Sequence, residues 1–478
     1  MQWIRGGRKA LLGFIVKRYE CGSSIMLRRS ITSEMKIKEI SRILYKIFSS
    51  LQLHRESSSS QLIAVATQMS QIYSKSTMDE RRIFLREMCT EYGVDHDALK
   101  LAIDAYRKDH STYRDLNIAS RTRYFRFLQA IGNVEYGVKC ICDIRADVLD
   151  FLSTSDLTRL EMNAMQKLEK ELRELLTLWF CLSNLQLFRL TWQSPADIVE
   201  KVAQSDIVHP VKDLLDMRRR VGAHRRCFLF MHEAMPREPL VVIHVALMNK
   251  IADSIQDIIE VDRLDSCESI NDTAIYYSIS STQPGLRGID LGNLLIKRVV
   301  SELQQTAPQI SIHSTLSPLP HFRSWLLNGL NDPSTAEKLF DERLIKLLLM
   351  DCKGFDNGKM IEDMRLSLLQ QIQKNDFQRY DEIKPVILHL AARYLCEAKQ
   401  PSSGRAIDPV ANFHLRNGAE IYRLNWRGNT SVRGMRSSLG LMVNYRYQME
   451  HVSENSAQYV NNKYIAVNDR VKSILQPL

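Results

Sequence analysis

The sequence contains no apolar run long enough to cross a membrane. Its longest one, Pro239–Met248, is about half of the roughly 20 residues that a transmembrane helix needs. Glycine and proline are also scarce, with 19 and 13 among 478 residues, and no segment repeats itself. These absences exclude collagen-like, disordered and solenoid proteins. With 45% hydrophobic and 25% charged residues, the chain is expected to form two or three globular domains.

Cysteine pairs that could form a zinc or redox site are missing as well. The nine cysteines are an odd number and lie far apart in the sequence. The closest two, Cys140 and Cys142, do not have the C-x-x-C spacing of such sites. We therefore expect reduced thiols in a reducing compartment and no bound metal.

Acidic residues are nearly absent from the first 33 positions. Met1–Ser33 has seven basic residues and one acid, Glu20, so it contributes +6 of the formal net charge of +10 and leaves +4 for the rest. This composition predicts a mitochondrial transit peptide within residues 1–35; the alternative is a disordered basic N-terminus of a cytosolic protein. Because the body is nearly neutral and lacks a clustered basic and aromatic face, no nucleic acid is expected as a partner.

Apolar residues recur at helical spacing through the first third of the chain. The pattern runs from about Lys36 to Cys181, for example along Leu157–Trp179, and almost no glycine or proline interrupts it. It predicts a helical bundle over residues 36–185.

After Pro195 the pattern changes to short runs rich in β-branched and aromatic residues. Each run is bounded by turn residues, so we expect strands at Cys227–His232, Leu240–Ala246, Ala274–Ser280, Ile310–Ser314, Ile421–Trp426 and Leu439–Tyr447. Helical patterns occupy Leu291–Gln305 and much of Asp332–Gln400. The sequence therefore predicts an α+β protein: an all-α N-terminal bundle, then an α/β domain over residues 186–478 with a helical insertion.

A glycine-containing loop, Gln283–Gly292, separates an expected strand from an expected helix. Backbone N–H groups at a helix N-terminus bind anions, and glycine allows a phosphate to approach closely. The alternative is a simple turn. The tract Arg287–Gly292 resembles the pyrophosphate loop of coenzyme-A-dependent N-acetyltransferases, in which Arg-Gly-x-Gly-x-Gly precedes a helix. Asp290 replaces the middle glycine here, which argues against ordinary acetyl transfer.

Two further residues are candidates for chemistry. Ser317 lies in Ser-Pro-Leu-Pro, where the fixed φ angles of Pro318 and Pro320 form a stiff corner before a helix; its alternative role is a helix cap or turn hydroxyl. His414 lies in Asn-Phe-His-Leu, and its alternative role is that of a hydrogen-bonded core residue. Spacing alone does not choose His414 from the 12 histidines.

Four stretches in order resemble the malonyl-CoA decarboxylase family: Val208–Ala246, Ala274–Leu327, Asp408–Ala419 and Gly440–Tyr447. The resemblance implies an N-terminal helical domain, used for tetrameric assembly, and an acetyltransferase-like catalytic domain. By motif, it implies that Ser317 and His414 are catalytic. It also implies that the coenzyme-binding loop consists of Arg287, Gly288, Ile289, Asp290, Leu291, Gly292 and Asn293.

The reaction that this resemblance implies is the conversion of malonyl-CoA to acetyl-CoA and CO2, a step that controls malonyl-CoA levels in fatty acid metabolism. The thioester carbonyl accepts the two electrons that CO2 leaves behind, so no cofactor is expected. His414 is expected to be the better proton donor near neutral pH because the reference pKa of histidine is about 6.5. Ser317 is expected to orient the carboxylate and complete a proton path; the family assigns it as proton acceptor.

Two other functions use the same coenzyme loop: an acyl-CoA acyltransferase, and a non-catalytic acyl-CoA-binding regulator in which Ser317 and His414 are structural. The expected location is the mitochondrial matrix, and a cytosolic form would arise if translation starts at Met26 or Met35. Family members often end in the peroxisomal signal Ser-Lys-Leu, whereas this chain ends in Gln-Pro-Leu, which does not favour peroxisomal delivery.

Overall fold

The computed structural model describes residues 39–49, 59–153, 157–260, 267–289, 291–351, 360–374 and 381–476. The expected transit peptide and Asp290 lie outside these residues. The chain forms two compact units. The helical unit contains the residues up to Asn184 together with His232–Pro236 and Gln283–Ile289; the sheet unit contains Leu185–Met231, Arg237–Thr282 and Asp290–Leu478. No helix within the described ranges is long and apolar enough to cross a membrane.

The helical unit confirms the predicted helical N-terminal region. Capping boxes start two of its helices, since Thr77 and Thr158 each exchange hydrogen bonds with the glutamate three residues later. The apolar stripe read along Leu157–Trp179 is largely the buried face of α8, which includes Met165, Leu168 and Leu172. The helices are one at 39–49, α2 (Ser59–Lys75), α3 (Met78–Glu91), α4 (His96–Lys108), η1 (His110–Thr112), α5 (Tyr113–Ala119), α6 (Arg123–Gly132), α7 (Gly137–Ser153), α8 (Arg159–Trp179) and η2 (Leu182–Asn184).

A short helix from far along the chain, η4 (Pro284–Leu286), also belongs to the helical unit. It packs on α7 so closely that a Cβ at Gly285 would lie 1.9 Å from the carbonyl oxygen of Cys142. Arg145, which is 2% exposed, donates a hydrogen bond to the carbonyl of Gly285 and forms an ion pair with Glu169 at 2.7 Å. Only glycine fits at position 285, and α7 thereby fixes the start of the predicted coenzyme loop.

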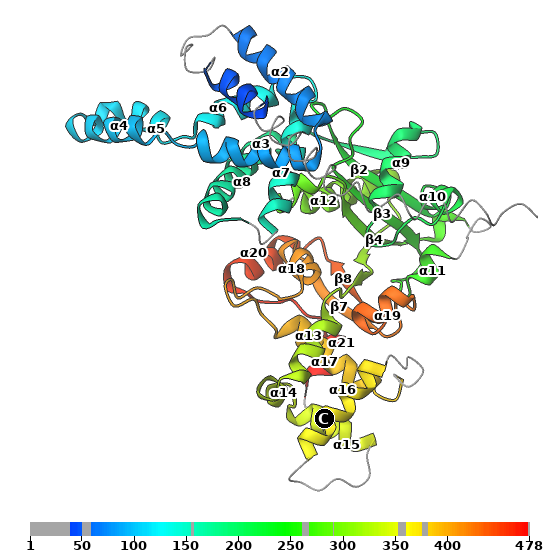
Figure 1. Ribbon diagram of the computed structural model, residues 1–478. Coiled ribbons are helices and arrows are strands. Elements are labelled where there is room, and N and C mark those ends of the chain that lie inside the picture. Colours follow the sequence, from blue (N-terminus) through cyan, green and yellow to red (C-terminus); the bar gives the residue numbers. More distant parts are fainter. Residues whose placement is uncertain are drawn as a thin grey trace, which may run out of the picture. The chain divides into compact units, whose positions relative to one another are not determined.

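The sheet unit is built on one mixed sheet with the strand order β1-β2-β3-β4-β5-β8-β6, and β7 also pairs with β8. Figure 1 labels β2, β3, β4, β7 and β8 of this sheet. β2, β3 and β4 are antiparallel neighbours, β4 and β5 run parallel, and β8 is antiparallel to β5, β6 and β7. The strands are β1 (Leu185–Leu190), β2 (Arg225–His232), β3 (Val241–Met248), β4 (Thr273–Ser281), β5 (Ile312–Thr315), β6 (Ser317–Pro318), β7 (Glu420–Asn425) and β8 (Met442–Tyr447).

The central strand β4 contains a β-bulge. Its register with β3 passes from His244↔Ser278 to Val245↔Tyr276, so Tyr277 is an extra residue. Because side chains alternate along a strand, one extra residue allows Tyr277 and Ser278 to face the same side of the sheet. Tyr277 packs near the rings of His209 and His244, and Ser278 donates a hydrogen bond to Asp206 on the same side.

The helices of the sheet unit follow the predicted alternation. The expected helical insertion is present as α13–α17, which gather as a group away from α9 and α10 (Figure 1). The helices are α9 (Ala196–Ser205), α10 (Leu214–Arg220), α11 (Gln256–Ile259), η3 (Glu268–Ile270), α12 (Gly292–Thr306), α13 (Phe322–Asn331), α14 (Pro333–Leu339), α15 (Glu342–Asp351), α16 (Met360–Lys374), α17 (Lys384–Cys396), α18 (Pro409–Arg416), α19 (Val432–Ser438), α20 (Val452–Asn462) and α21 (Asp469–Leu475).

Candidate active site

Ser317 and His414 are 97 residues apart in the sequence and lie within hydrogen-bonding distance. The Oγ atom of Ser317 is 3.1 Å from Nε2 of His414. Both side chains are buried, with 5% and 3% of their surfaces exposed. Ser317 lies on β6, where it pairs with Val443 of β8, and His414 lies on α18. The stiff corner expected at Ser-Pro-Leu-Pro is thus a two-residue strand that leads into α13.

The sequence around His414 fixes both ends of α18. The carboxylate of Asp408 accepts hydrogen bonds from the N–H groups of Val410 and Ala411, and Pro409 occupies the first helical position. Beyond the helix, Gly418 has a φ of +83°, and a Cβ there would lie 2.0 Å from the carbonyl oxygen of Val452. A short helix with both ends fixed places His414 in one orientation.

Three aromatic or hydroxyl side chains complete the surroundings of the pair. The hydroxyl of Tyr447 lies 2.8 Å from Nδ1 of His414, and Ser317 donates a hydrogen bond of 2.9 Å to Oγ1 of Thr315. The ring of Tyr445 stacks on the imidazole with a centroid distance of 4.6 Å. Each nitrogen of His414 therefore has a partner on a different strand of the sheet.

Burial determines the charge states at this site. Burial lowers the pKa of His414 to about 3 and raises the pKa of Tyr447 well above 10. Both groups are therefore neutral at physiological pH. The reference pKa of histidine, which led us to expect an imidazolium as proton donor, does not apply here: any proton that His414 supplies comes from the N–H of a neutral imidazole.

The hydrogen-bond directions follow from these protonation states. Because the hydroxyl hydrogen of Ser317 is directed to Thr315, the oxygen of Ser317 can accept a hydrogen bond from Nε2–H of His414. Nδ1 then accepts from the hydroxyl of Tyr447. This chain of donors suits hydrogen bonding and proton delivery, whereas activation of a serine nucleophile would require a bare Nε2.

The N-terminus of α12 lies beside the histidine helix. A Cβ on Gly292 would be 2.9 Å from the ring of Phe413, the residue before His414, so glycine allows the two helices to approach. Leu291 and Gly292 begin α12, whose first turn has no acidic residue. N–H groups at such a helix start attract anions. Of the expected coenzyme loop, Gly292 and Asn293 are therefore the first residues of α12, and Leu291 directly precedes them. This helix start lies close to His414.

The other described residues of the expected loop belong to the helical unit. Arg287 and Gly288 are exposed, and Ile289 is partly buried. Gly288 has a φ of +80° with nothing within 4 Å of an added Cβ. Glycine is thus needed there for its backbone conformation, and the exposed amide leaves room for a ligand.

Sequence motifs did not reveal the partners of the pair. Thr315 and Tyr447 lie inside motifs that resemble the family, but alternation along a strand does not say which side chain meets His414. Of the other motif residues, Tyr445 contacts His414, Asn412 accepts a hydrogen bond from Tyr459, and Arg446 packs over the ring of Tyr422. The pairing of β5 and β8, which sets His313 opposite Tyr447, was the missing information.

Two family models match the chain: the malonyl-CoA decarboxylase C-terminal domain over residues 183–478 and the malonyl-CoA decarboxylase N-terminal domain over residues 92–180. A relative from Anser anser anser, "Malonyl-CoA decarboxylase, mitochondrial", is 37% identical over 81% of this chain and 78% of its own. The mitochondrial malonyl-CoA decarboxylase of Mus musculus is 37% identical over 83% of this chain and 82% of its own.

Solved structures agree with this assignment. The crystal structure of malonyl-CoA decarboxylase from Rhodopseudomonas palustris matches with a TM-score of 0.77 and 30% identity, covering 91% of this chain and 99% of that one. The enzyme from Agrobacterium vitis matches with a TM-score of 0.75 and 31% identity over 92% and 100% of the two chains. These matches, together with the fold they share with it, show that this chain belongs to the malonyl-CoA decarboxylase family.

Proposed function

We propose that this protein decarboxylates malonyl-CoA to acetyl-CoA and CO2, with Ser317 and His414 at the reacting end of the substrate. Family membership supports the reaction. The observation that carries the residue assignment is the buried hydrogen bond between Ser317 and His414, beside the N-terminus of α12. On this proposal, residues 186–478 are the catalytic domain.

Coenzyme binding is assigned to the loop Arg287–Asn293. The N–H groups at the start of α12 would bind a phosphate of the coenzyme. Phosphate binding, remote from the bond that breaks, would hold the malonyl group in position. The C–CO2 bond then lies roughly perpendicular to the thioester plane, so that its electrons enter the carbonyl.

The reaction proceeds in two steps. The bond between the α-carbon and the carboxylate breaks, CO2 leaves, and the electron pair forms the enolate of acetyl-CoA. The enolate carbon then takes up one proton, which gives acetyl-CoA. The hydroxyl of Ser317 and the Nε2–H of His414 would orient the carboxylate and hydrogen-bond the enolate, since a neutral imidazole is a competent hydrogen-bond donor to an enolate; the proton that one of them gives to carbon would be replaced on it by a proton from water. A positioned proton donor contributes about 10²–10⁴ in rate.

Release of labelled CO2 from malonyl-CoA tests both parts of the proposal. We expect rapid release by the wild type and its loss in Ser317→Ala and His414→Asn, with folding and acetyl-CoA binding retained. Ser438→Ala and His389→Asn are matched controls, because both side chains are buried and hydrogen-bonded on other helices, α19 and α17. Activity retained in both site variants would discard the pair; no release by the folded wild type would discard the reaction and favour an acyltransferase or a binding protein.

Location and assembly are separate proposals. We infer import into the mitochondrial matrix, which the basic N-terminal composition and the mitochondrial relatives support. A fluorescent fusion without residues 1–33 should lose import, and unchanged import would discard the targeting claim.

We also propose a tetramer that assembles through the helical domain, residues 36–185. This assembly is implied by the family. It is supported by α4, which has no buried residue and extends with α5 away from the other helices of its unit (Figure 1). Leu101 on α4 is 71% exposed, and Tyr113 and Ile118 on α5 are exposed as well. Light scattering should report a tetramer that Leu101→Glu dissociates; a monomeric wild type would refute the assembly.

A further inference from the structure

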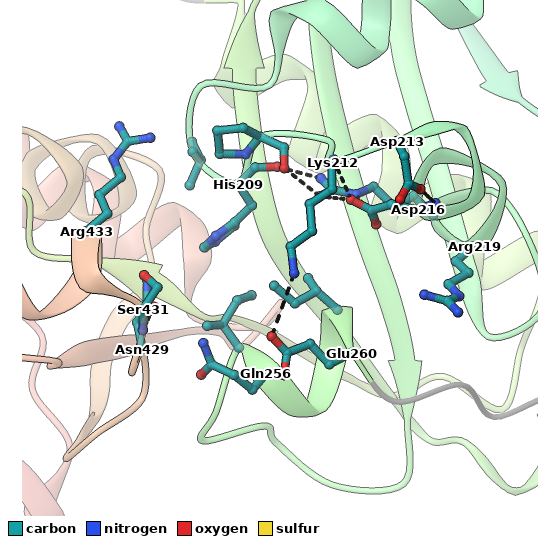
Figure 2. A pocket seen from close by; sticks show the side chains of 15 residues that line it. His209, Lys212, Asp213, Asp216, Arg219, Gln256, Glu260, Asn429, Ser431 and Arg433 are labelled. Atoms are coloured by element: carbon teal, nitrogen blue, oxygen red, sulfur yellow. Dashed lines mark hydrogen bonds and ion pairs between the residues drawn. The ribbon is translucent and has the colours of Figure 1, made fainter. Parts of the chain in front are cut away.

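The sheet unit contains a cavity that the proposed reaction does not use. It measures about 390 Å³ and lies between the segment that leads into α10, helix α11 and the turn before α19 (Figure 2). This volume falls within the range of small-molecule sites. Apolar walls come from Ile255 and Ile259, and polar side chains come from Gln256, Asn429 and Ser431.

A buried ion network makes one wall of this cavity rigid. Arg220 is 4% exposed and pairs with Asp206 at 2.8 Å and with Asp216 at 2.9 Å. Its guanidinium also donates to the carbonyl oxygen of His209 at 2.7 Å. The charge of Arg220 is therefore already balanced, and its function in this wall is to fix the backbone that carries His209.

His209 has an unused hydrogen-bonding atom inside the cavity. The residue is only 7% exposed, and Nε2 has no hydrogen-bond partner among the described residues. Figure 2 shows its imidazole directed into the cavity, between the side chains of Lys212 and Arg433. A buried polar atom without a partner costs about 1–3 kcal/mol, so a ligand that satisfies it would regain this energy.

The charges around the cavity favour an anion. Lys212, Arg219 and Arg433 provide three cationic groups at its rim. Asp213 caps α10 and Asp216 binds Arg220, whereas Glu260 lies 3.9 Å from Lys212, so an anion that binds Lys212 competes with this ion pair. A carboxylate or phosphate group could therefore bind between the rim cations and His209, whose imidazole is neutral without a ligand because burial lowers its pKa to about 4, and would take up a proton as the anion binds.

The cavity and the Ser317–His414 pair lie on opposite faces of the sheet. Ile255 in the cavity wall belongs to the same core cluster as Leu316, Tyr277 and Met442. Leu316 precedes Ser317, and adjacent side chains in extended backbone point in opposite directions. A ligand in the cavity would thus lie behind the strand that carries Ser317.

We propose that this cavity is a binding site for a small organic anion, a carboxylate or a phosphate ester, whose apolar portion packs on Ile255 and Ile259 while its charged group binds His209, Lys212 and Arg433. The anion is either a separate metabolite or the nucleotide end of coenzyme A. This site goes beyond the proposed decarboxylation, and only its assignment to coenzyme A rests on the proposed function.

Calorimetric titration of the full chain with hexanoate and with adenosine monophosphate tests the site. We expect binding of at least one probe with one-to-one stoichiometry, weakened about tenfold or more by Arg433→Met and by His209→Phe, as the loss of one charge-assisted hydrogen bond predicts. Arg436→Met removes the same charge from the same helix outside the cavity and should leave binding unchanged. Ser317→Ala should also bind normally, which separates this site from the active site.

Two results would overturn the proposal: no binding of either probe by the wild type, or binding that Arg433→Met does not weaken. Arg433 is exposed, so its replacement is not expected to impair folding even if that of His209 does. Titration in the presence of saturating coenzyme A identifies the source of the anion. Displacement of the probe assigns the site to the coenzyme, and undisturbed binding assigns it to a separate metabolite.

Discussion

Both nitrogens of the His414 imidazole have hydrogen-bonding partners, and the two partners affect the chemistry of the imidazole differently. Nε2 faces Ser317, whereas Nδ1 faces Tyr447, which remains protonated because burial raises its pKa. In a neutral histidine, the hydrogen bond at one nitrogen decides whether the other carries the proton. Tyr447 is therefore a positioning residue that sets the tautomer of His414.

Replacing Tyr447 with phenylalanine tests this function. Without the hydroxyl, Nδ1 of His414 loses its donor, so the tautomer with Nε2–H is no longer favoured. We expect kcat to fall about ten- to a hundredfold, as when the orienting partner of a functional histidine is removed. KM should change little, because Tyr447 lies outside the loop that we propose binds the coenzyme. Steady-state decarboxylation kinetics give both values.

The control is Tyr73→Phe, which removes a buried tyrosine hydroxyl from the helical unit, where it donates to Asp147 at 2.6 Å. If both tyrosine variants lose similar stability but kcat is unchanged in Tyr73→Phe, then Tyr447 acts by positioning His414 and not by packing alone. An equal fall of kcat and stability in both variants would contradict the assignment of Tyr447.

Arg220 is a second residue whose effect depends on its partners, in this case its contribution to stability through two ion pairs. Arg220→Met would leave Asp206 and Asp216 without their cation in a buried site, which typically destabilises by about 3–5 kcal/mol. Arg218→Met, on the exposed side of the same helix, should change the free energy of unfolding by less than about 0.5 kcal/mol. Urea titrations of both variants measure the difference. Equal stabilities would show that water or local rearrangement compensates the two carboxylates.

At the scale of elements, the sequence predicted the long features and missed the short ones. Strands β2 to β5, β7 and β8 and helices α8 and α12 appear where expected. The six-residue β1 was not predicted, and the two-residue β6 and the eight-residue α18 are too short to show a period. Ser317 and His414 lie on two of these missed elements. Motif resemblance identified both residues, but only the pairing of distant strands brings them together.

The packing of η4 on α7 leads to a prediction about two glycines of one loop. Gly285→Ala forces a Cβ to within 1.9 Å of a backbone oxygen, which side-chain movement does not relieve. We expect a loss of about 3 kcal/mol or more, since backbone displacement adds to ordinary overpacking. Gly288→Ala meets no atom but must adopt a positive φ, at a cost of about 1–2 kcal/mol.

Thermal unfolding of the two glycine variants provides the comparison. Gly285→Ala should lower Tm more than Gly288→Ala does. Gly288→Ala should instead weaken binding of acetyl-CoA if this amide contacts the coenzyme. A variant at position 285 as stable as the wild type would show that η4 does not hold its position on α7.

For the whole molecule, buried histidines predict how stability depends on pH. Burial lowers the pKa values of His209, His244 and His313 to about 4, and that of His414 to about 3. In the unfolded chain each titrates near 6.5. Between these values the unfolded state binds more protons, so the free energy of unfolding falls as pH drops from about 6.5 towards 4. Above 6.5 both states are neutral and the effect is absent.

The contribution of one histidine, His313, to this pH dependence can be measured separately. His313→Gln should reduce the pH dependence of the free energy of unfolding at pH 5 by about 1.4 kcal/mol per pH unit, the contribution of one proton. His451→Gln, which replaces an exposed histidine, is the control variant. The slopes are measured by urea unfolding at several pH values between roughly 4.5 and 7. This window covers most of the range between the lowered pKa in the folded protein and the reference pKa in the unfolded chain. Identical slopes for wild type and His313→Gln would mean that His313 is protonated in the folded protein.

The segment Gln283–Ile289 completes the helical unit, and this affects how the protein folds during synthesis. Arg145 on α7 binds the carbonyl of Gly285, 140 residues later, so the helical unit remains incomplete until that segment has left the ribosome. Closing so long a loop costs entropy before any contact repays it, which slows this step of folding. Splitting the gene after Asn184 would therefore separate α7 from the segment that completes it, and the two polypeptides would have to find each other by diffusion.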